Sequence, residues 1–315
     1  MLCRFLLVLL LPALLELFST SPAACDETPD YYRNLGAQLF EQKRFTDSIT
    51  AFDHAIKLSP RTVNLYNERA AAYKRCNQYK QASADMQMAI TLEPKNVEYC
   101  LTYAGLGKAD GNSKQEIEGY TRCLALEPEN VYVLVERARA YRSIRDFDHS
   151  LQDYNSAFAV LPATAENKDD LGDMCRERGL LWLHRKDYAR AISDFNNGLK
   201  YKPSNMAIIR NRADAYAGAG QEEKAVQDLS RCISQESRIN SRMDAVRRRG
   251  QCYVLLKNYP KALADANQLI EADHDDVDAL MMRAKIYAEQ GKSDLEKKDR
   301  AAIAKYQEEM APPKE

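Results

Sequence analysis

The sequence predicts an all-α protein made of repeated helical hairpins, and three observations lead to that prediction. Four prolines follow one another at a constant interval: Pro60, Pro94, Pro128 and Pro162. Small residues and large aromatic residues return at matching positions between these prolines. Each half of the period holds apolar residues at i, i+3, i+4 and i+7, which is the spacing of an amphipathic helix. A fixed period of about 34 residues with two such stripes indicates stacked pairs of helices.

Eight such units fill the chain from about residue 29 to about residue 310. They begin near residues 29, 63, 97, 131, 172, 206, 243 and 277. The eighth position of each unit is small: Gly36, Ala70, Ala104, Ala138, Gly179, Ala213, Gly250 and Ala284. The eleventh position is mostly large and aromatic: Tyr73, Tyr141, Trp182, Tyr216, Tyr253 and Tyr287. Small residues let two helices approach closely where they cross, and aromatic rings fill the remaining space.

Departures from the period predict local changes of structure. Pro162 and Pro203 are separated by more than one period, and the excess places an insertion near residues 163–171 that extends a loop or the start of a helix. A second excess, of three residues, falls near Asn240. In the last unit Glu296 and Arg300 stand where apolar residues belong. We therefore expect this unit to be a polar cap, which a stack of repeats needs at its end.

This pattern resembles the tetratricopeptide repeat, and the resemblance runs from about Tyr31 to Met310. It implies a right-handed superhelical solenoid of about eight hairpins, whose first helices line a concave groove. It also implies a protein that binds other proteins. In such arrays the second, fifth, sixth, ninth and twelfth positions of each first helix face the groove.

Arginine gathers at or beside these positions in the C-terminal half of the chain. The residues that we expect to contact a partner are Arg142, Arg176, Arg210, Asn211, Arg247 and Arg248. Guanidinium groups hold carboxylates through two parallel hydrogen bonds. We therefore expect a positive strip that receives an acidic or carboxylate-ended segment of a partner protein, and we expect Arg210→Glu together with Arg247→Glu to leave thermal stability nearly unchanged. The alternative is that the arginines pair with acids on the same helices and only solvate the surface: Asp173, Glu177, Asp214 and Asp244.

One subset of the family grips the C-terminal carboxylate of chaperones with lysine, asparagine and arginine residues spread over three units. Arg176, Asn211 and Arg248 stand at similar positions here. Leu180 and Asp244, however, occupy two positions where asparagine and lysine are expected. The sequence therefore does not favour a chaperone clamp.

Residues 1–24 predict a secretory signal peptide. Arg4 precedes an apolar stretch over residues 5–15, and small residues follow up to Ala24. Glu16 ends the apolar stretch short of the ~20 residues that a membrane-spanning helix needs. We therefore expect a protein located outside the cytoplasm, in the periplasm or secreted. The alternatives are a retained membrane anchor and a lipid anchor on Cys25.

The composition argues against catalysis and against nucleic-acid binding. The chain has 45 basic and 46 acidic side chains and a net charge of −1, so no global attraction to nucleic acid or anionic lipid is expected. The four histidines lie at different phases of different units, and the glycines form no phosphate-binding loop. The cysteines form no CxxC pair. We therefore expect no enzyme, no metal site and no cofactor.

Two sets of side-chain pairs are predicted inside the hairpins. Six units carry arginine at the seventh position and aspartate at the twenty-third, and the two units without the arginine also lack the aspartate. This matched occurrence predicts six ion pairs: Arg69–Asp85, Arg137–Asp153, Arg178–Asp194, Arg212–Asp228, Arg249–Asp265 and Arg283–Asp299. As partly exposed pairs, each would contribute about 0.2 to 1 kcal/mol. In the third unit Cys100 and Cys123 face each other in the same register, which makes them candidates either for a disulfide or for two reduced core thiols.

Three functions fit the sequence. The first is an adaptor outside the cytoplasm that binds a peptide or protein segment in the concave groove. The second is a structural subunit of an envelope or secretion complex that uses the convex face, and apolar patches on the second helices would favour it. The third is an accessory fragment of a catalytic system, for which the chain offers no additional domain. Affinity capture would distinguish these functions best.

Overall fold

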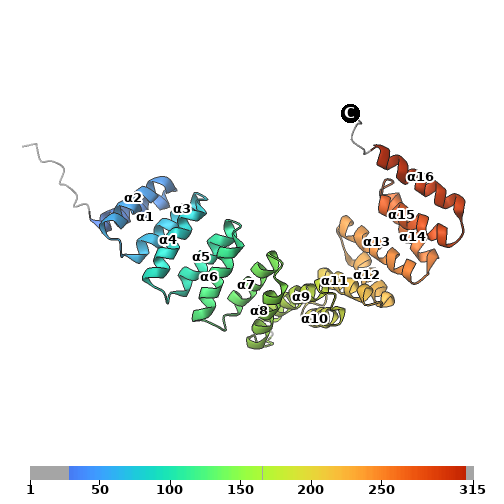
Figure 1. Ribbon diagram of the computed structural model, residues 1–315, viewed down its shortest axis with the longest axis horizontal. Coiled ribbons are helices and arrows are strands. Elements are labelled where there is room, and N and C mark those ends of the chain that lie inside the picture. Colours follow the sequence, from blue (N-terminus) through green and yellow to red (C-terminus); the bar gives the residue numbers. More distant parts are fainter. Residues whose placement is uncertain (1–27, 165, 310–315) are drawn as a thin grey trace, which may run out of the picture. The chain divides into compact units, whose positions relative to one another are not determined.

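The computed structural model describes residues 28–164 and 166–309, and the regular structure of these residues is sixteen α-helices (Figure 1). The helices are α1 (Pro29–Glu41), α2 (Phe45–Leu58), α3 (Val63–Arg75), α4 (Tyr79–Leu92), α5 (Val97–Ala109), α6 (Ser113–Leu126), α7 (Val131–Ser143), α8 (Phe147–Val160), α9 (Lys168–His184), α10 (Tyr188–Tyr201), α11 (Met206–Gly218), α12 (Glu222–Gln235), α13 (Ile239–Leu255), α14 (Tyr259–Ala272), α15 (Val277–Glu289) and α16 (Ser293–Glu309). The predicted signal peptide and Cys25 lie outside the described residues.

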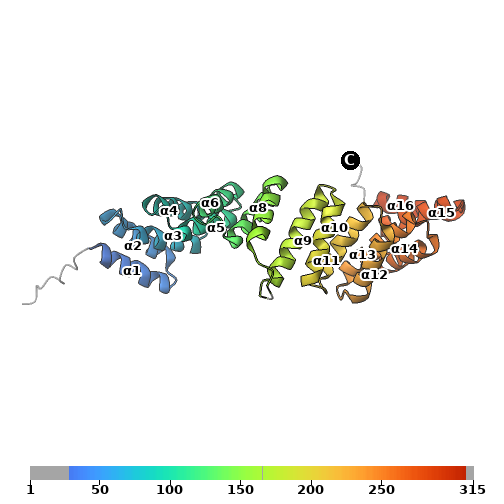
Figure 2. The ribbon, with the colours of Figure 1, turned by 90° about the horizontal axis from the view of Figure 1, so that it is seen from below.

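The helices form two compact units, and the boundary falls between Arg145 and Asp146. The first unit contains α1–α7 and the second contains α8–α16. Within each unit consecutive helices pack against each other as hairpins, and each hairpin packs on the next. Figure 2 shows the helices of the second unit following one another side by side. The all-α class and the stacking of hairpins are confirmed.

The turn inside each hairpin requires a left-handed backbone at one position. The fifteenth residue of every unit has φ between 56° and 72°. Glycine fills that position in three units, and its missing Cβ makes this conformation accessible. In the other five units a lysine, an asparagine or an arginine adopts it. The turn therefore recurs at a fixed place although its sequence varies.

The small eighth position lies where the two helices of a hairpin cross. A Cβ added to Gly36 would lie 2.8 Å from the ring of Phe52, and one added to Gly179 would lie 2.6 Å from the ring of Phe195. Both phenylalanines are fully buried. Glycine is therefore required where the facing residue is phenylalanine. Ala213 can stand at this position because it shares a buried cluster with the smaller Leu229.

The two sequence insertions lie where first helices begin. Helices α9 and α13 have 17 residues each, whereas the other first helices have 13. The added residues lengthen each helix at its start, which in α9 is Lys168. At the other end of the chain, Asp299 is the one buried residue over 293–308 of α16, in keeping with a polar cap. Among the described residues no helix combines the length and the apolar character that a membrane span requires.

Five of the six predicted arginine–aspartate pairs are present, each within one hairpin. They are Arg69–Asp85, Arg178–Asp194, Arg212–Asp228, Arg249–Asp265 and Arg283–Asp299. Arg137 lies before the boundary between the two compact parts of the structure and Asp153 lies after it, so their pairing stays a prediction.

The predicted disulfide is not formed. Cys100 and Cys123 are free and buried thiols. They lie close to each other, as the antiparallel register requires, since each thiol affects the pKa of the other. The Cys123 thiol also donates to the carbonyl oxygen of Val97 at 3.8 Å. Burial and, to a smaller extent, the neighbouring Cys100 together raise the pKa of Cys123 to about 12. The pair is thus part of the packed core of the hairpin.

Candidate partner-binding site

The first helices of neighbouring hairpins lie side by side in the second unit. Helix α9 contacts α11, and α13 contacts α15. An ion pair between Arg248 and Asp214 joins α13 to α11. The first-helix face is the set of side chains at the second, fifth, sixth, ninth and twelfth positions of the repeat units that begin at residues 172, 206, 243 and 277, and these side chains lie on α9, α11, α13 and α15. Five of the predicted contact residues belong to these helices, whereas Arg142 belongs to α7 of the first unit.

The four arginines predicted on this face all have carboxylate partners. Arg176 donates to Glu177 at 3.4 Å, and Arg210 donates to Glu236 at 3.3 Å. Arg248 contacts two acids, Asp214 at 2.5 Å and Asp244 at 3.0 Å. Two carboxylates therefore surround one guanidinium, which leaves a local charge of −1. The arginines do not form an uncompensated positive strip, and the alternative of pairing with neighbouring acids describes them better.

Arg247 is a structural residue. Its two terminal nitrogens donate to the two carboxylate oxygens of Asp276 at 2.8 and 2.7 Å. Asp276 is also the N-cap of α15 and accepts from the backbone N–H of Ala279 at 3.0 Å. Burial acts to raise the pKa of Asp276, but the hydrogen bonds from Arg247 and the backbone outweigh it and hold that pKa below its ordinary value. Charge reversal at Arg247 would place a second carboxylate against Asp276, so we expect it to lower stability and not to leave it unchanged.

Three other polar groups of the first-helix face have no internal partner. Within the described residues, neither the amides of Asn211 and Gln251 nor the Lys285 ammonium makes a side-chain hydrogen bond or an ion pair. Asn211 is half-buried on α11 and Lys285 is exposed on α15. The Nε atom of Arg210, next to Asn211 in the chain, is buried and also has no partner. These groups retain the capacity to bind another molecule.

A hollow of about 430 Å³ lies between α13 and α15 on the same face. Its lining residues are Gln251, Val254, Leu255, Asp278, Met281, Met282 and Lys285. Leu255 is 62% exposed and Met281 is 48% exposed. Both are large apolar side chains in contact with solvent, although Met282 beside them is buried. Sequence reasoning missed this hollow, but Met281 was a visible signal, because it stands at the fifth position where the three preceding units have arginine.

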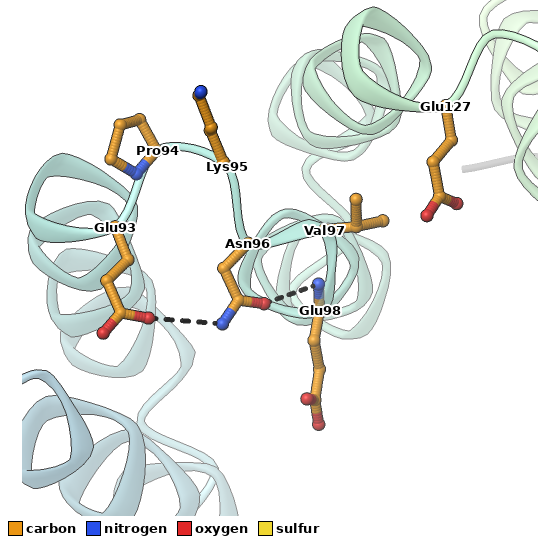
Figure 3. Close-up of a pocket in the computed structure, with 7 residues that line it drawn as sticks. All are labelled: Glu93, Pro94, Lys95, Asn96, Val97, Glu98 and Glu127. Carbon is orange, nitrogen blue, oxygen red and sulfur yellow. Dashed lines mark hydrogen bonds between the residues drawn. The ribbon is translucent and has the colours of Figure 1, made fainter.

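A second hollow, in the first unit, is explained by the repeat itself. It has about 800 Å³ and is lined by residues 93–98 and Glu127 (Figure 3). Asn96 caps α5 by accepting from the N–H of Glu98 at 3.1 Å, and its amide nitrogen donates to Glu93 at 3.4 Å. The corresponding loop one hairpin further forms a similar hollow around Pro128. Because it recurs with the turn and its polar groups serve as caps, we assign this hollow to the architecture. In the described part of the chain, no group of three or more histidine, cysteine, aspartate or glutamate side chains is placed to hold a metal ion.

Comparison with known proteins identifies the family. Models of the tetratricopeptide repeat match residues 63–96 and 256–313. Together with the eight-fold period and the stacked hairpins, these matches show that the chain belongs to the tetratricopeptide repeat family. Proteins of this kind present extended surfaces to other proteins, so the matches support a role in protein–protein interaction.

Similar proteins match parts of this chain. Human sperm-associated antigen 1 is 32% identical over 106 residues, which is 34% of this chain and 11% of that protein. The heat-shock protein cognate co-chaperone sgt12 of Aspergillus fumigatus is 38% identical over 56 residues, 18% of this chain and 16% of the relative. The chain thus spans only a small part of these two relatives. The crystal structure of the C-terminal part of a tetratricopeptide repeat protein from Cytophaga hutchinsonii has a TM-score of 0.63 at 17% identity, covering 79% of this chain and 98% of that one, which supports the fold.

Proposed function

We propose that the protein is a non-catalytic adaptor, located outside the cytoplasm, that binds an extended segment of a partner protein along the first-helix face of its second unit. The observation that carries the proposal is the hollow between α13 and α15, where apolar side chains remain exposed on a face that also holds polar groups without internal partners. Such a combination of apolar surface and a few convergent polar groups is typical of binding sites.

The polar groups suit an extended polypeptide. The Asn211 amide offers both a donor and an acceptor, which is what a peptide backbone requires. Lys285 offers a positive charge that no carboxylate of the described residues compensates. We therefore place the preference for an acidic or carboxylate-ended segment at Lys285. Arg247 and Arg248, whose charges are already matched, act instead in linking α13 to the neighbouring first helices α15 and α11.

A chaperone clamp is not part of this proposal. Arg248 stands at a clamp-like position, but its Nε already contacts Asp244 at 3.0 Å and its Nη1 contacts Asp214 at 2.5 Å. Asp244 is also the residue that replaces the lysine of the clamp pattern. A ligand that carries carboxylates would therefore meet a local charge of −1 around Arg248.

The alternative function, a structural subunit that uses the second helices, has weaker support. The large exposed apolar side chains that the structure describes on second helices are Leu58, Met88, Leu126 and Leu295. They lie on α2, α4, α6 and α16, so no two share a helix. Single exposed apolar residues are normal for a protein surface. By contrast, Leu255 and Met281 line one hollow on the first-helix face.

The test is affinity capture from the native envelope or secretory fraction, followed by mass spectrometry. We expect the variant Asn211→Ala with Lys285→Ala to lose at least tenfold of the partner that the unaltered protein captures. The matched control is Asn240→Ala with Lys298→Ala, which removes the same groups from exposed sites elsewhere in the second unit. Equal capture by both variants would refute binding at this face. N-terminal sequencing of the native protein tests the location, and an N-terminus near Ala24 or Cys25 is the expected result.

A further inference from the structure

The exposed apolar side chains of the hollow indicate what kind of residue the partner segment places there. Burying a leucine or methionine side chain stabilises a fold, so leaving Leu255 and Met281 largely exposed forgoes stability. Val254 and Met282 complete the apolar lining. Methionine side chains are flexible and adapt to different shapes. The hollow is therefore suited to a long apolar side chain without a rigid shape requirement.

Charge changes sign along α15 across this hollow. Asp278 lies one turn before Met281, and Lys285 lies one turn after it. Asp278 is 3.6 Å from Arg247, whereas Lys285 has no partner among the described residues. Side chains at i and i+4 of a helix are neighbours, with about 5–6 Å between their Cβ atoms. An apolar group placed over Met281 would thus lie about 5–6 Å from the Lys285 side of the hollow, where the charge is positive and unpaired among the described residues, and on its other side it would meet the carboxylate of Asp278.

Only one spacing of two side chains along an extended peptide fits both Met281 and Lys285. Each residue of an extended chain advances about 3.3 Å, and side chains at i and i+2 point to the same side, about 6.6 Å apart. That separation matches the step from Met281 to Lys285, whereas neighbours at i and i+1 point to opposite sides. We propose that the hollow binds a leucine-like or methionine-like side chain whose segment carries an acidic residue, or a C-terminal carboxylate, two positions away. This inference rests on the proposed function and specifies its ligand.

The test uses the full protein with 13C-methyl-labelled methionine and synthetic ten-residue Gly/Ser peptides that contain one leucine and one glutamate. The two residues are placed one, two or three positions apart, in both orders. We expect the methyl signals of Met281 and Met282 to shift, and the separation of two to bind at least fivefold more tightly than the others. Replacing the leucine of the peptide by serine should weaken binding at least tenfold.

The matched variants are Leu255→Ser with Met281→Ser, and Ile239→Ser with Leu295→Ser. All four side chains are exposed by 43% to 64%, so the fold tolerates both changes. We expect only the first variant to lose the advantage of leucine over serine in the peptide. Equal binding of leucine and serine peptides, or equal loss in both variants, would overturn the inference. After such a result, a loss of partner capture by Lys285→Ala would keep the proposed adaptor function without the apolar subsite. Unchanged capture by Lys285→Ala would refute the adaptor function as well as the subsite.

Discussion

Arg249 binds Asp265 through two parallel hydrogen bonds that join α13 to α14. The Nε atom donates to Oδ2 at 3.0 Å and Nη2 donates to Oδ1 at 2.6 Å. The remaining nitrogen, Nη1, donates to the Ser230 hydroxyl of the preceding hairpin at 3.2 Å. One guanidinium therefore fixes the crossing inside its own hairpin and also links that hairpin to the previous one.

The same link recurs through the repeat. The third arginine nitrogen reaches the twenty-fifth position of the preceding hairpin, where the acceptors are Asp53, Thr121, Asn155, Asn196, Ser230 and Asn267. In the third unit Tyr103 replaces the arginine and accepts a hydrogen bond from Gln87, which also stands at the twenty-fifth position. The connection between hairpins is thus kept even where the ion pair is lost.

Breaking the Arg249–Asp265 pair should cost more than an exposed ion pair does. The side chain of Asp265 is only 4% exposed, so Arg249→Met leaves a buried carboxylate without its partner. We expect a loss of about 3 kcal/mol in the free energy of unfolding, measured by urea denaturation. This exceeds the range of about 0.2 to 1 kcal/mol for partly exposed pairs, because removing the arginine leaves a buried and unpaired carboxylate.

The double variant Arg249→Met with Asp265→Leu is the control. It removes both charges together and replaces them by apolar groups of similar size, so it should lose clearly less stability than the single variant. A single variant that loses less than about 1 kcal/mol would show that the pair behaves like a surface pair.

The sequence predicted the hairpins and their internal pairs because both depend on spacing. A constant period places the seventh and twenty-third positions opposite each other in every copy, so the pairs could be inferred without coordinates. The pairing of Arg247 with Asp276 and of Arg248 with Asp214 could not, because these contacts join different hairpins. Their geometry depends on how one hairpin packs on the next, and no repeated spacing within a unit reports it. The hollow beside Met281 depends on the same packing.

Gly119 should tolerate no added side chain. A Cβ at this position would lie 2.7 Å from the backbone nitrogen of Ala104 on the facing helix. Gly119→Ala therefore forces α5 and α6 apart and should cost about 1 to 3 kcal/mol in the free energy of unfolding. Gly105 is the control within the same hairpin, since its added Cβ meets nothing within 4 Å.

Gly105→Ala should leave stability unchanged or raise it by up to about 1 kcal/mol, because alanine is the better helix former. Urea denaturation of both variants measures the difference. Equal effects of the two substitutions would contradict the close helix crossing at Gly119.

The buried thiols should react slowly in the folded protein. Burial raises the pKa of Cys123 and of Cys175 to about 12, and that of Cys252 to about 11. The thiolate is the reactive form, so these groups are almost entirely protonated at pH 8. Cys76 is only half-buried. Among the cysteines of the described residues, we expect iodoacetamide at pH 8 to modify Cys76 first, as read by peptide mass spectrometry.

The control is the same reaction in urea. Unfolding exposes the buried thiols, so the cysteines of the described residues should then react with iodoacetamide at similar rates. If Cys123 reacted as fast as Cys76 without urea, the packing of the third hairpin would have to be looser than the structure shows.

The ion pair between Arg247 and Asp276 should make stability depend on pH in the acid range. Burial acts to raise the pKa of Asp276, but the hydrogen bonds from Arg247 and the backbone hold it below the ordinary value of about 3.9. A carboxyl group with a lowered pKa in the folded state stabilises the fold fully above its unfolded pKa. That contribution is lost as the pH falls from about 4 through the lower, folded pKa.

Asp276→Asn tests this dependence, since asparagine keeps an acceptor for the N-cap of α15 but carries no charge. We expect the variant to be less stable than the unaltered protein at pH 7, with a difference that shrinks as the pH falls below about 4. Urea denaturation at pH 7, 5, 4 and 3 measures both proteins. Arg247→Glu, which places a second carboxylate against Asp276, should be less stable than Asp276→Asn at pH 7 and should recover part of that loss in acid. A difference between Asp276→Asn and the unaltered protein that stays constant from pH 7 to pH 3 would show that the charge of Asp276 does not contribute.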